Sequence, residues 1–138
     1  MNATVRWIQG LTLVGVSDSN HWIVMDTDAD VGGSGGAAKP LELVLIGLGG
    51  CTAMDVVSML KKMHVSLDAF EIRLHADRAE DHPKVFTKIR LEYRLFGKDI
   101  DPQKVERAID LSKSKYCSVS AMLGKAAEIE YGFTIQPS

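Results

Sequence analysis

The sequence contains few cysteines, few prolines and few aromatic residues, and this scarcity excludes several classes of protein. Two cysteines in 138 residues are too few for the disulfide scaffold of a small secreted domain. With only four prolines and no internal repeat, the chain is neither collagen-like nor of low complexity. Apolar residues make up 46% and charged residues 25%, so the chain has the composition and length to bury a hydrophobic core.

No excess of charge and no long hydrophobic run points to nucleic acid or to a membrane. Lys and Arg number 16 against 18 Asp and Glu, so the net charge of −2 lacks the basic excess that a phosphate backbone requires. The longest stretch without a charge, Leu43–Met54, is shorter than the roughly 20 residues that span a bilayer. No apolar signal-peptide segment follows Arg6. We therefore expect a cytoplasmic protein with no nucleic-acid and no membrane partner.

Alternation of apolar and polar residues predicts the strands. Phe70–Ala76 and Ile89–Leu95 alternate with a period of two and predict a hairpin over about residues 68–97. Ile129–Ile135 repeats the pattern and predicts a final strand over about 127–136. Short segments rich in β-branched and aromatic residues predict an N-terminal meander over about 2–26.

Proline and an N-cap residue mark the starts of two helices. Pro40 suits the first turn of a helix that runs over about residues 40–64. Asp101 followed by Pro102 predicts the start of a second helical region over about 102–125. Together with the strands, these helices predict a single α+β domain over residues 1–138.

The first of these helices is apolar on every side in its middle, unlike a helix at a protein surface. A domain of this size with one modest sheet needs a second chain to bury such a helix, so we expect an intimate homodimer. Gly47, Gly49 and Gly50 lie inside the helix, where each glycine costs about 1 kcal/mol relative to alanine. Three glycines in four positions predict a kink or the close approach of another backbone.

One acidic, glycine-rich loop resembles two ligand-binding motifs and satisfies neither. Asp26, Asp28 and Asp30 imitate the start of an EF-hand, but Val31 stands where glycine is needed and Ala37 where a glutamate ligand belongs. Its glycines follow their strand too late for a dinucleotide-binding turn. The four histidines share no metal-ligand spacing with each other or with a cysteine. We expect no metal and no bound cofactor.

The two cysteines are the candidates for chemistry. If the glycines kink the helix, Cys51 lies in the first turn of its second half, where free N–H groups favour a thiolate. Cys117 follows Lys113 and Lys115, which either lower the pKa of the thiol or simply end a solvated helix. As a pair the cysteines suit a peroxidatic and resolving couple that forms a reversible disulfide. The alternative is that both are packing residues of the core.

Several short motifs together resemble the OsmC/Ohr family. They are Pro40-Leu41-Glu42-Leu43, Gly49-Gly50-Cys51, Asp55-Val56-Val57 and Lys115-Tyr116-Cys117-Ser118-Val119, and the likeness is nearest to the OsmC-like, YhfA-type branch. The resemblance covers essentially the whole chain. It implies an intertwined α+β homodimer, with antiparallel sheets packed around two central cysteine-bearing helices. It also implies thiol-dependent reduction of organic hydroperoxides, with an external dithiol or lipoyl-type reductant and no resident cofactor.

Carried over residue by residue, the resemblance makes Cys51 the peroxidatic thiolate and Cys117 the resolving thiol. The family's activating glutamate directly follows the proline, where this chain has Leu41, so Glu42 is the candidate one position later. For the activating arginine the candidates are Arg6, in the first strand, and Arg78, near the hairpin tip. Without such a guanidinium, a helix dipole alone is worth about 0.3 to 1 kcal/mol and lowers a thiol pKa by less than one unit.

A different function is a dimer without catalysis that binds a small apolar ligand or senses electrophiles beside Cys51. The feature that separates it from a peroxidase is a cation within reach of the Cys51 sulfur.

Overall fold

The computed structural model describes residues 1–138, which form two compact units, Met1–Val44 and Leu45–Ser138. Each unit contains a three-stranded sheet of its own. The α+β class is confirmed, whereas a single domain over residues 1–138 stays a prediction.

The first unit is built on an antiparallel meander. Strands β1 (Ala3–Gln9), β2 (Thr12–Ser17) and β3 (Ile23–Met25) pair in that order, as the sequence predicted. Gly10 adopts a φ of 54° at the tight turn between β1 and β2, a conformation that favours glycine. A short helix η1 (Ala29–Val31) follows in the glycine-rich loop.

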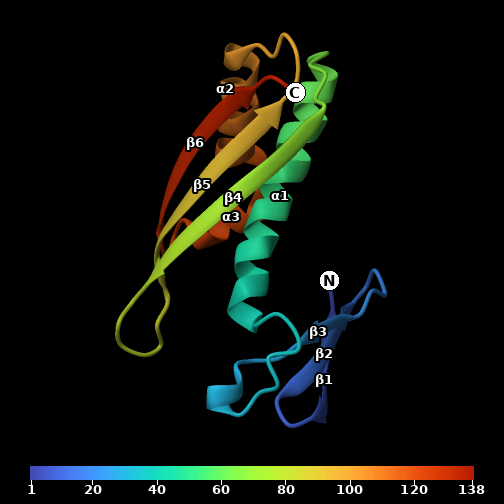
Figure 1. Cartoon of the computed structure of the whole chain (residues 1–138), viewed down its shortest axis with the longest axis vertical. Helices are drawn as coiled ribbons and strands as arrows, with labels where there is room; N and C mark the ends of the chain where they lie inside the picture. The colour runs from blue at the N-terminus through green and yellow to red at the C-terminus, as the bar shows by residue number, and fades with distance from the viewer. The chain divides into compact units, whose positions relative to one another are not determined.

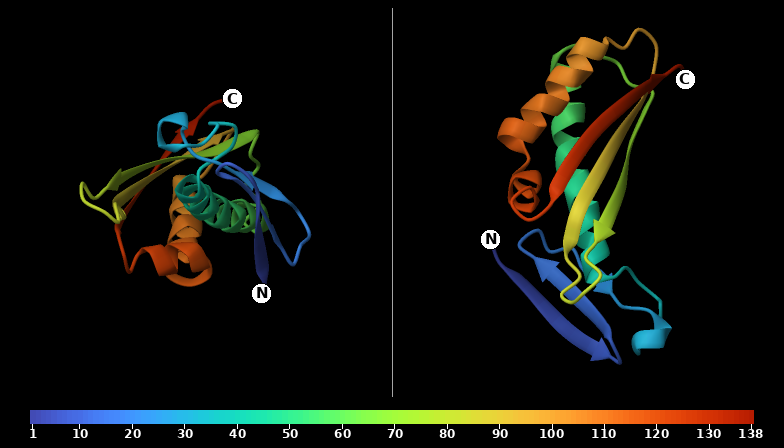
Figure 2. Two further views of the ribbon diagram at one scale, coloured as in Figure 1. Left: turned by 90° about the horizontal axis from the view of Figure 1, so that it is seen from below. Right: turned by 90° about the vertical axis from the view of Figure 1, so that its left-hand side faces the viewer.

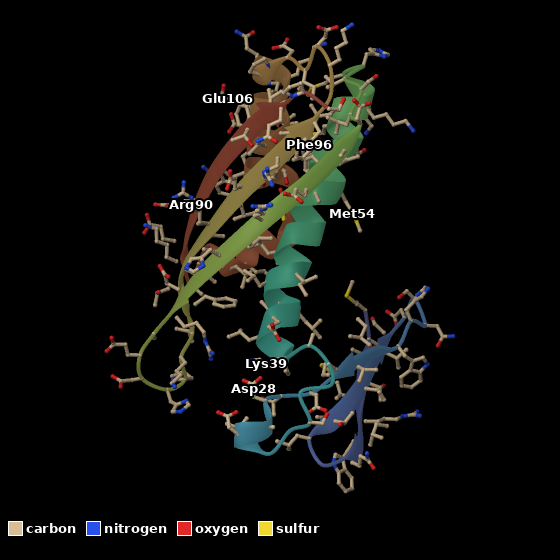
Figure 3. All side chains as sticks on the ribbon, in the orientation of Figure 1. Asp28, Lys39, Met54, Arg90, Phe96 and Glu106 are labelled. Atoms are coloured by element: carbon tan, nitrogen blue, oxygen red, sulfur yellow. The ribbon has the colours of Figure 1, made fainter.

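The acidic loop is held by hydrogen bonds to one buried carboxylate. Asp26 is 2% exposed and accepts bonds from the Thr12 hydroxyl at 2.7 Å and from the Ser34 hydroxyl at 2.6 Å, as well as from the N–H groups of Thr27 and Ser34. Asp28 lies beside Lys39 and pairs with its ammonium at 2.8 Å (Figure 3). Both carboxylates therefore bind groups of the loop and its flanking residues. The structure contains no cluster of three or more His, Cys, Asp or Glu residues that could hold a metal ion.

The second unit places its helices on one face of a sheet. Strands β4 (Ala69–Arg78), β5 (Phe86–Phe96) and β6 (Glu128–Gln136) form the sheet with β5 in the middle. The helices α1 (Pro40–Lys62) and α2 (Pro102–Leu111) cover the same face of this sheet (Figures 1 and 2). The predicted alternation is confirmed on β5, where every second side chain is fully buried. These residues are Ile89, Leu91, Tyr93 and Leu95. They pack against Leu48, Val56 and Leu60 of α1 and Val105 and Ala108 of α2.

The prediction of purely antiparallel sheets is wrong at one pair of strands. β4 and β5 form the expected antiparallel hairpin, but β6 runs parallel to β5. A parallel pair needs a long crossover connection, which is supplied here by α2 (Pro102–Leu111), the π-helical turn η2 (Ser112–Tyr116) and α3 (Ser118–Leu123). Asp101 caps α2 by accepting a hydrogen bond from the Gln103 N–H at 2.9 Å, as predicted. Cys117 therefore belongs to the crossover.

The glycines of α1 do not kink it, because α1 is one continuous helix over Pro40–Lys62. A Cβ atom at Gly49 would lie 2.8 Å from Cδ1 of Leu74, so this glycine lets a β4 side chain approach the helix closely. Gly47 and Gly50 have open space where a Cβ would be. The predicted close approach is therefore made by a side chain at Gly49, and the half-helix expected before Cys51 does not exist.

The side of α1 turned away from the sheet is apolar and exposed. Ile46 is 62%, Met54 76% and Val57 41% exposed, and Met54 projects away from β4, β5 and β6 (Figure 3). By length and composition α1 could cross a bilayer, a test that core helices of soluble proteins also pass, and 28% of its apolar stretch is buried. The homodimer and the absence of a membrane partner both stay predictions.

Candidate functional site

The two cysteines, 66 positions apart in the sequence, lie side by side in the second unit. Cys51 is half-buried in the middle of α1, and Cys117 is 3% exposed at the N-cap of α3. The two thiols are close enough that each acts on the pKa of the other. The Cys117 sulfur itself accepts the Ser120 N–H at 3.4 Å, so the short helix α3 holds it in place. Both cysteines are free thiols.

The donors that face Cys51 come from the start of α3. The Val119 N–H and the Ser118 hydroxyl act on Cys51 as hydrogen-bond donors and lower the pKa of its thiol. The first N–H groups of a helix have no partner inside it, so those of α3 are available to an external acceptor. The free N–H groups that sequence analysis sought in a second half of α1 are thus supplied by a different helix.

The surroundings of the two thiols shift their pKa values in opposite directions. Burial of the sulfur acts to raise the pKa of Cys51, but the bonds from Val119, Cys117 and Ser118 outweigh it, so the pKa lies below that of an ordinary thiol. The Asp55 carboxylate opposes this change. Burial raises the pKa of Cys117, and the neighbouring Cys51 raises it further. The pair therefore favours a Cys51 thiolate that accepts a hydrogen bond from a Cys117 thiol.

The lysines beside Cys117 in the sequence turn towards aromatic rings instead. Lys113 lies 4.8 Å from the ring centroid of Tyr131, and Lys115 lies 5.2 Å from that of Tyr116. The largest contributions to the pKa of Cys51 come from burial, from neutral hydrogen-bond donors and from Asp55, and none of them is a cation. Stabilisation of a thiolate here comes from neutral donors of α3.

The other three predicted site residues have local partners. In the first unit, the Arg6 guanidinium stacks 5.5 Å from the Trp22 ring centroid, and the Glu42 carboxylate accepts the Lys39 N–H at 2.8 Å. In the second unit, Arg78 donates from Nε to the Lys84 carbonyl at 2.9 Å. Arg78 is not among the groups that act on Cys51. A catalytic role for these three residues stays a prediction.

A chain of buried hydroxyl groups runs beside the cysteines. Thr52 Oγ1 lies 2.7 Å from Tyr93 Oη and 2.8 Å from Ser112 Oγ, and Ser112 Oγ donates to Asp55 Oδ2 at 2.9 Å. An ionised carboxylate only accepts hydrogen bonds, so the hydroxyl protons point in one direction, from Tyr93 through Thr52 and Ser112 to Asp55. The chain links α1, β5 and η2 and fixes the orientation of the Asp55 carboxylate.

A cavity of about 340 Å³ begins at Asp55 and extends along the C-terminal half of α1. Its apolar walls are Met59, Met63, Leu111 and Tyr116, and Ser58 and Lys62 complete the lining. The volume falls in the range of small-molecule sites.

Sequence reasoning missed the residues around the sulfurs for a physical reason. Asp55, Ser118 and Val119 belong to the short motifs of the sequence analysis, whereas Thr52, which directly follows Cys51, lies outside them. Their position beside Cys51 arises because the crossover folds back onto α1, and a local sequence pattern does not predict such a tertiary contact. The helical i, i+4 spacing of Cys51 and Asp55 was the one signal available before the structure.

Comparison with known proteins gives concordant matches. The family model described as "OsmC-like protein" matches residues 33–132. Protein YhfA of Escherichia coli strain K12 is 43% identical over 136 residues, which cover 98% of both chains. A hypothetical protein from Aquifex aeolicus VF5 superposes with a TM-score of 0.87 at 26% identity, covering 99% of this chain and 96% of that one. The organic hydroperoxide resistance protein OsmC from Legionella pneumophila shares the fold, with a TM-score of 0.71 at 13% identity and 97% of each chain covered.

Proposed function

The chain belongs to the OsmC-like family, and we propose that it is a thiol-dependent peroxidase that reduces organic hydroperoxides. The observation that carries the proposal is that two free thiols, Cys51 and Cys117, lie near each other in the fold, and that the pKa of Cys51 is lowered. The Legionella pneumophila protein that shares the fold is named an organic hydroperoxide resistance protein, which supports the choice of substrate.

In the first step the Cys51 thiolate attacks the terminal oxygen of the hydroperoxide ROOH. The S–O bond forms as the O–O bond breaks, sulfur is oxidised to the sulfenic acid, and the peroxide is reduced to an alcohol once the leaving alkoxide takes a proton. The Val119 N–H and the Ser118 hydroxyl stabilise the attacking thiolate.

In the second step the Cys117 sulfur attacks the Cys51 sulfenic acid. An S–S bond forms, the S–OH bond breaks, and the hydroxyl leaves as water with the proton of Cys117. An external dithiol then exchanges with this disulfide, returns both cysteines to thiols and becomes a disulfide itself. The proximity of Cys51 and Cys117, each of which acts on the pKa of the other, supports this second step.

The proposed enzyme works as a homodimer that covers the outer face of α1. Ile46, Met54 and Val57 on that face are exposed and apolar, which a stable soluble chain rarely leaves uncovered along a whole helix. Light scattering after gel filtration is expected to give twice the 15.1 kDa chain mass. The variant Met54→Glu is expected to shift the population towards the monomer, whereas the exposed-site control Val85→Glu leaves the dimer intact.

The activity is tested by stopped-flow reduction of cumene hydroperoxide with dihydrolipoamide as the reductant. Wild type is expected to turn over, Cys51→Ser to lose turnover, and Cys117→Ser to stop after a sulfenic acid that dimedone traps at Cys51. Loss of turnover in Cys51→Ser with an unchanged melting temperature separates chemistry from folding. Wild type that neither turns over nor yields a sulfenic acid would refute the peroxidase.

A second candidate function is a non-catalytic dimer that binds an apolar ligand or senses electrophiles. It is favoured by the cavity of about 340 Å³ beside Asp55 and by the lack of a cation acting on Cys51 within the second unit. Stoichiometric alkylation of Cys51 without any peroxide turnover would select this function.

A further inference from the structure

We propose that Asp55 is a specificity-determining residue that repels anions from Cys51, so that the site takes uncharged, chain-like molecules with the chain lying in the cavity beside Asp55. The inference rests on the proposed function for its substrate, an uncharged organic hydroperoxide. Its test needs only a reactive Cys51.

Asp55 is placed next to Cys51 by the geometry of α1. Four residues make slightly more than one helical turn, so the side chains of Cys51 and Asp55 lie on the same face, with Cβ atoms about 5 to 6 Å apart. A molecule that approaches the sulfur along this face meets the carboxylate. The negative charge of Asp55 acts on the Cys51 thiolate itself.

The carboxylate is fixed rather than mobile. Ser112 Oγ donates to Asp55 Oδ2 at 2.9 Å, and Ser112 is itself 0% exposed and bonded to Thr52. A hydroxyl group satisfies the carboxylate without neutralising it. A charged side chain at the surface usually swings away from an approaching anion, whereas Asp55 is held beside the cysteine.

No cation offsets this charge in the structure of the second unit. Asp55 takes part in no ion pair, and Lys113 and Lys115 lie over aromatic rings. Lys62 lines the same cavity but stands seven positions after Asp55, roughly 10 Å along the helix axis, and eleven after Cys51. Among the charged residues that line the cavity, Asp55 is therefore the one nearer to Cys51 along α1.

The cavity beside Asp55 can bind the apolar part of a substrate. Its walls of Met59, Met63, Leu111 and Tyr116 suit an alkyl or aryl chain, and methionine adapts to chains of different shape. If the ligand carries a carboxylate at the end that lies beside Asp55, its binding is weakened by desolvation of that carboxylate and by its repulsion from Asp55. The same chain ending in an uncharged hydroperoxide meets neither cost.

The test compares two alkylating reagents that differ in charge. Neutral iodoacetamide and anionic iodoacetate attack through the same thiolate, which displaces iodide, so the thiolate fraction cancels in the ratio of their rates. The rates are measured at Cys51 by peptide mass spectrometry at pH 7.5 and low salt. We expect the ratio of iodoacetamide to iodoacetate rates to fall roughly threefold to tenfold in Asp55→Asn, as the repulsion between close charges is removed.

Two variants separate the position of the charge from its mere presence. Asp110→Asn removes the same charge from an exposed site on α2 and is expected to leave the ratio within a factor of about 1.5. Ser112→Ala keeps the charge but releases the carboxylate, and its ratio is expected to lie between those of wild type and Asp55→Asn. An unchanged ratio in a folded Asp55→Asn overturns the proposal.

A measurement on the wild type keeps the test decisive if Asp55→Asn does not fold. Raising the ionic strength from 0.01 to 0.5 M screens the carboxylate, so the iodoacetamide to iodoacetate ratio is expected to fall at least twofold. A ratio independent of salt refutes the role of Asp55. Because alkylation occurs without peroxide, either result stands whether or not the protein turns hydroperoxides over.

Discussion

Replacing Thr52 by valine is expected to destabilise the fold through a single lost hydroxyl group. Thr52 is 1% exposed, and its Oγ1 is the hydrogen-bond partner of Tyr93 Oη, which is 0% exposed, at 2.7 Å. Valine has nearly the same shape and leaves the phenol with no acceptor. It also removes the donor to Ser112, which keeps its own bond to Asp55.

The magnitude follows from the number of groups left without a partner. The Tyr93 hydroxyl loses its acceptor, which costs about 1 to 3 kcal/mol, and Ser112 Oγ loses a donor, which costs less. The free energy of unfolding is therefore expected to fall by about 2 to 4 kcal/mol. For a chain of 138 residues this lowers the melting temperature by roughly 7 to 14 °C. Thermal unfolding followed by circular dichroism measures it, with Thr52→Ser as the control that keeps the hydroxyl.

A double-mutant cycle tests the cause. Adding Tyr93→Phe to Thr52→Val removes the orphaned phenol hydroxyl, so the double variant is expected to recover at least about 1 kcal/mol relative to the sum of the single changes. If the two losses simply add, the hydrogen bond between Thr52 and Tyr93 is not what stabilises this region.

Three other predictions concern acidity and oxidation. Ser118→Ala removes a donor to the Cys51 thiolate, so the pKa of Cys51 is expected to rise and alkylation by iodoacetamide at pH 7 to slow roughly threefold to tenfold, with the pH profile moved upward. The Ser34 and Thr12 hydroxyls and two N–H groups hold the pKa of Asp26 well below its usual range, so the stability that this carboxylate contributes is present above about pH 4 and is lost as the pH falls further. Melting temperatures between pH 7 and pH 3 are expected to show a smaller acid loss in Asp26→Asn than in wild type. A disulfide between Cys51 and Cys117, 66 positions apart, is expected to add roughly 4 kcal/mol to the free energy of unfolding, which denaturation with and without a dithiol measures.

The elements of the fold could be predicted from local patterns because each depends on short-range physics. The two-residue alternation of β5 is the burial of every second side chain, and Asp101 with Pro102 marks the start of α2 by capping alone. The pairing of β6 could not be predicted this way, since the direction of a strand depends on the path of the connection before it. The crossover through α2, η2 and α3 sets that direction.

The site was predictable only in part for the same reason. Cys51 and Cys117 drew attention as the two sulfur nucleophiles of the chain, but the expected kink at Gly49 was wrong because that glycine makes room for Leu74. A glycine inside a helix indicates that a neighbouring group packs closely against it, but the sequence does not identify that group. The donors from Ser118 and Val119 depend on a tertiary contact between α1 and α3, which composition and periodicity do not encode.

Cys117 combines two tasks in one sulfur atom, because it caps α3 through the Ser120 N–H and also touches Cys51. If that atom bonds to Cys51, the first turn of α3 becomes covalently tied to the middle of α1. The connection between β5 and β6 would then be anchored to α1 by a covalent bond, and oxidation would restrict the movement of that connection.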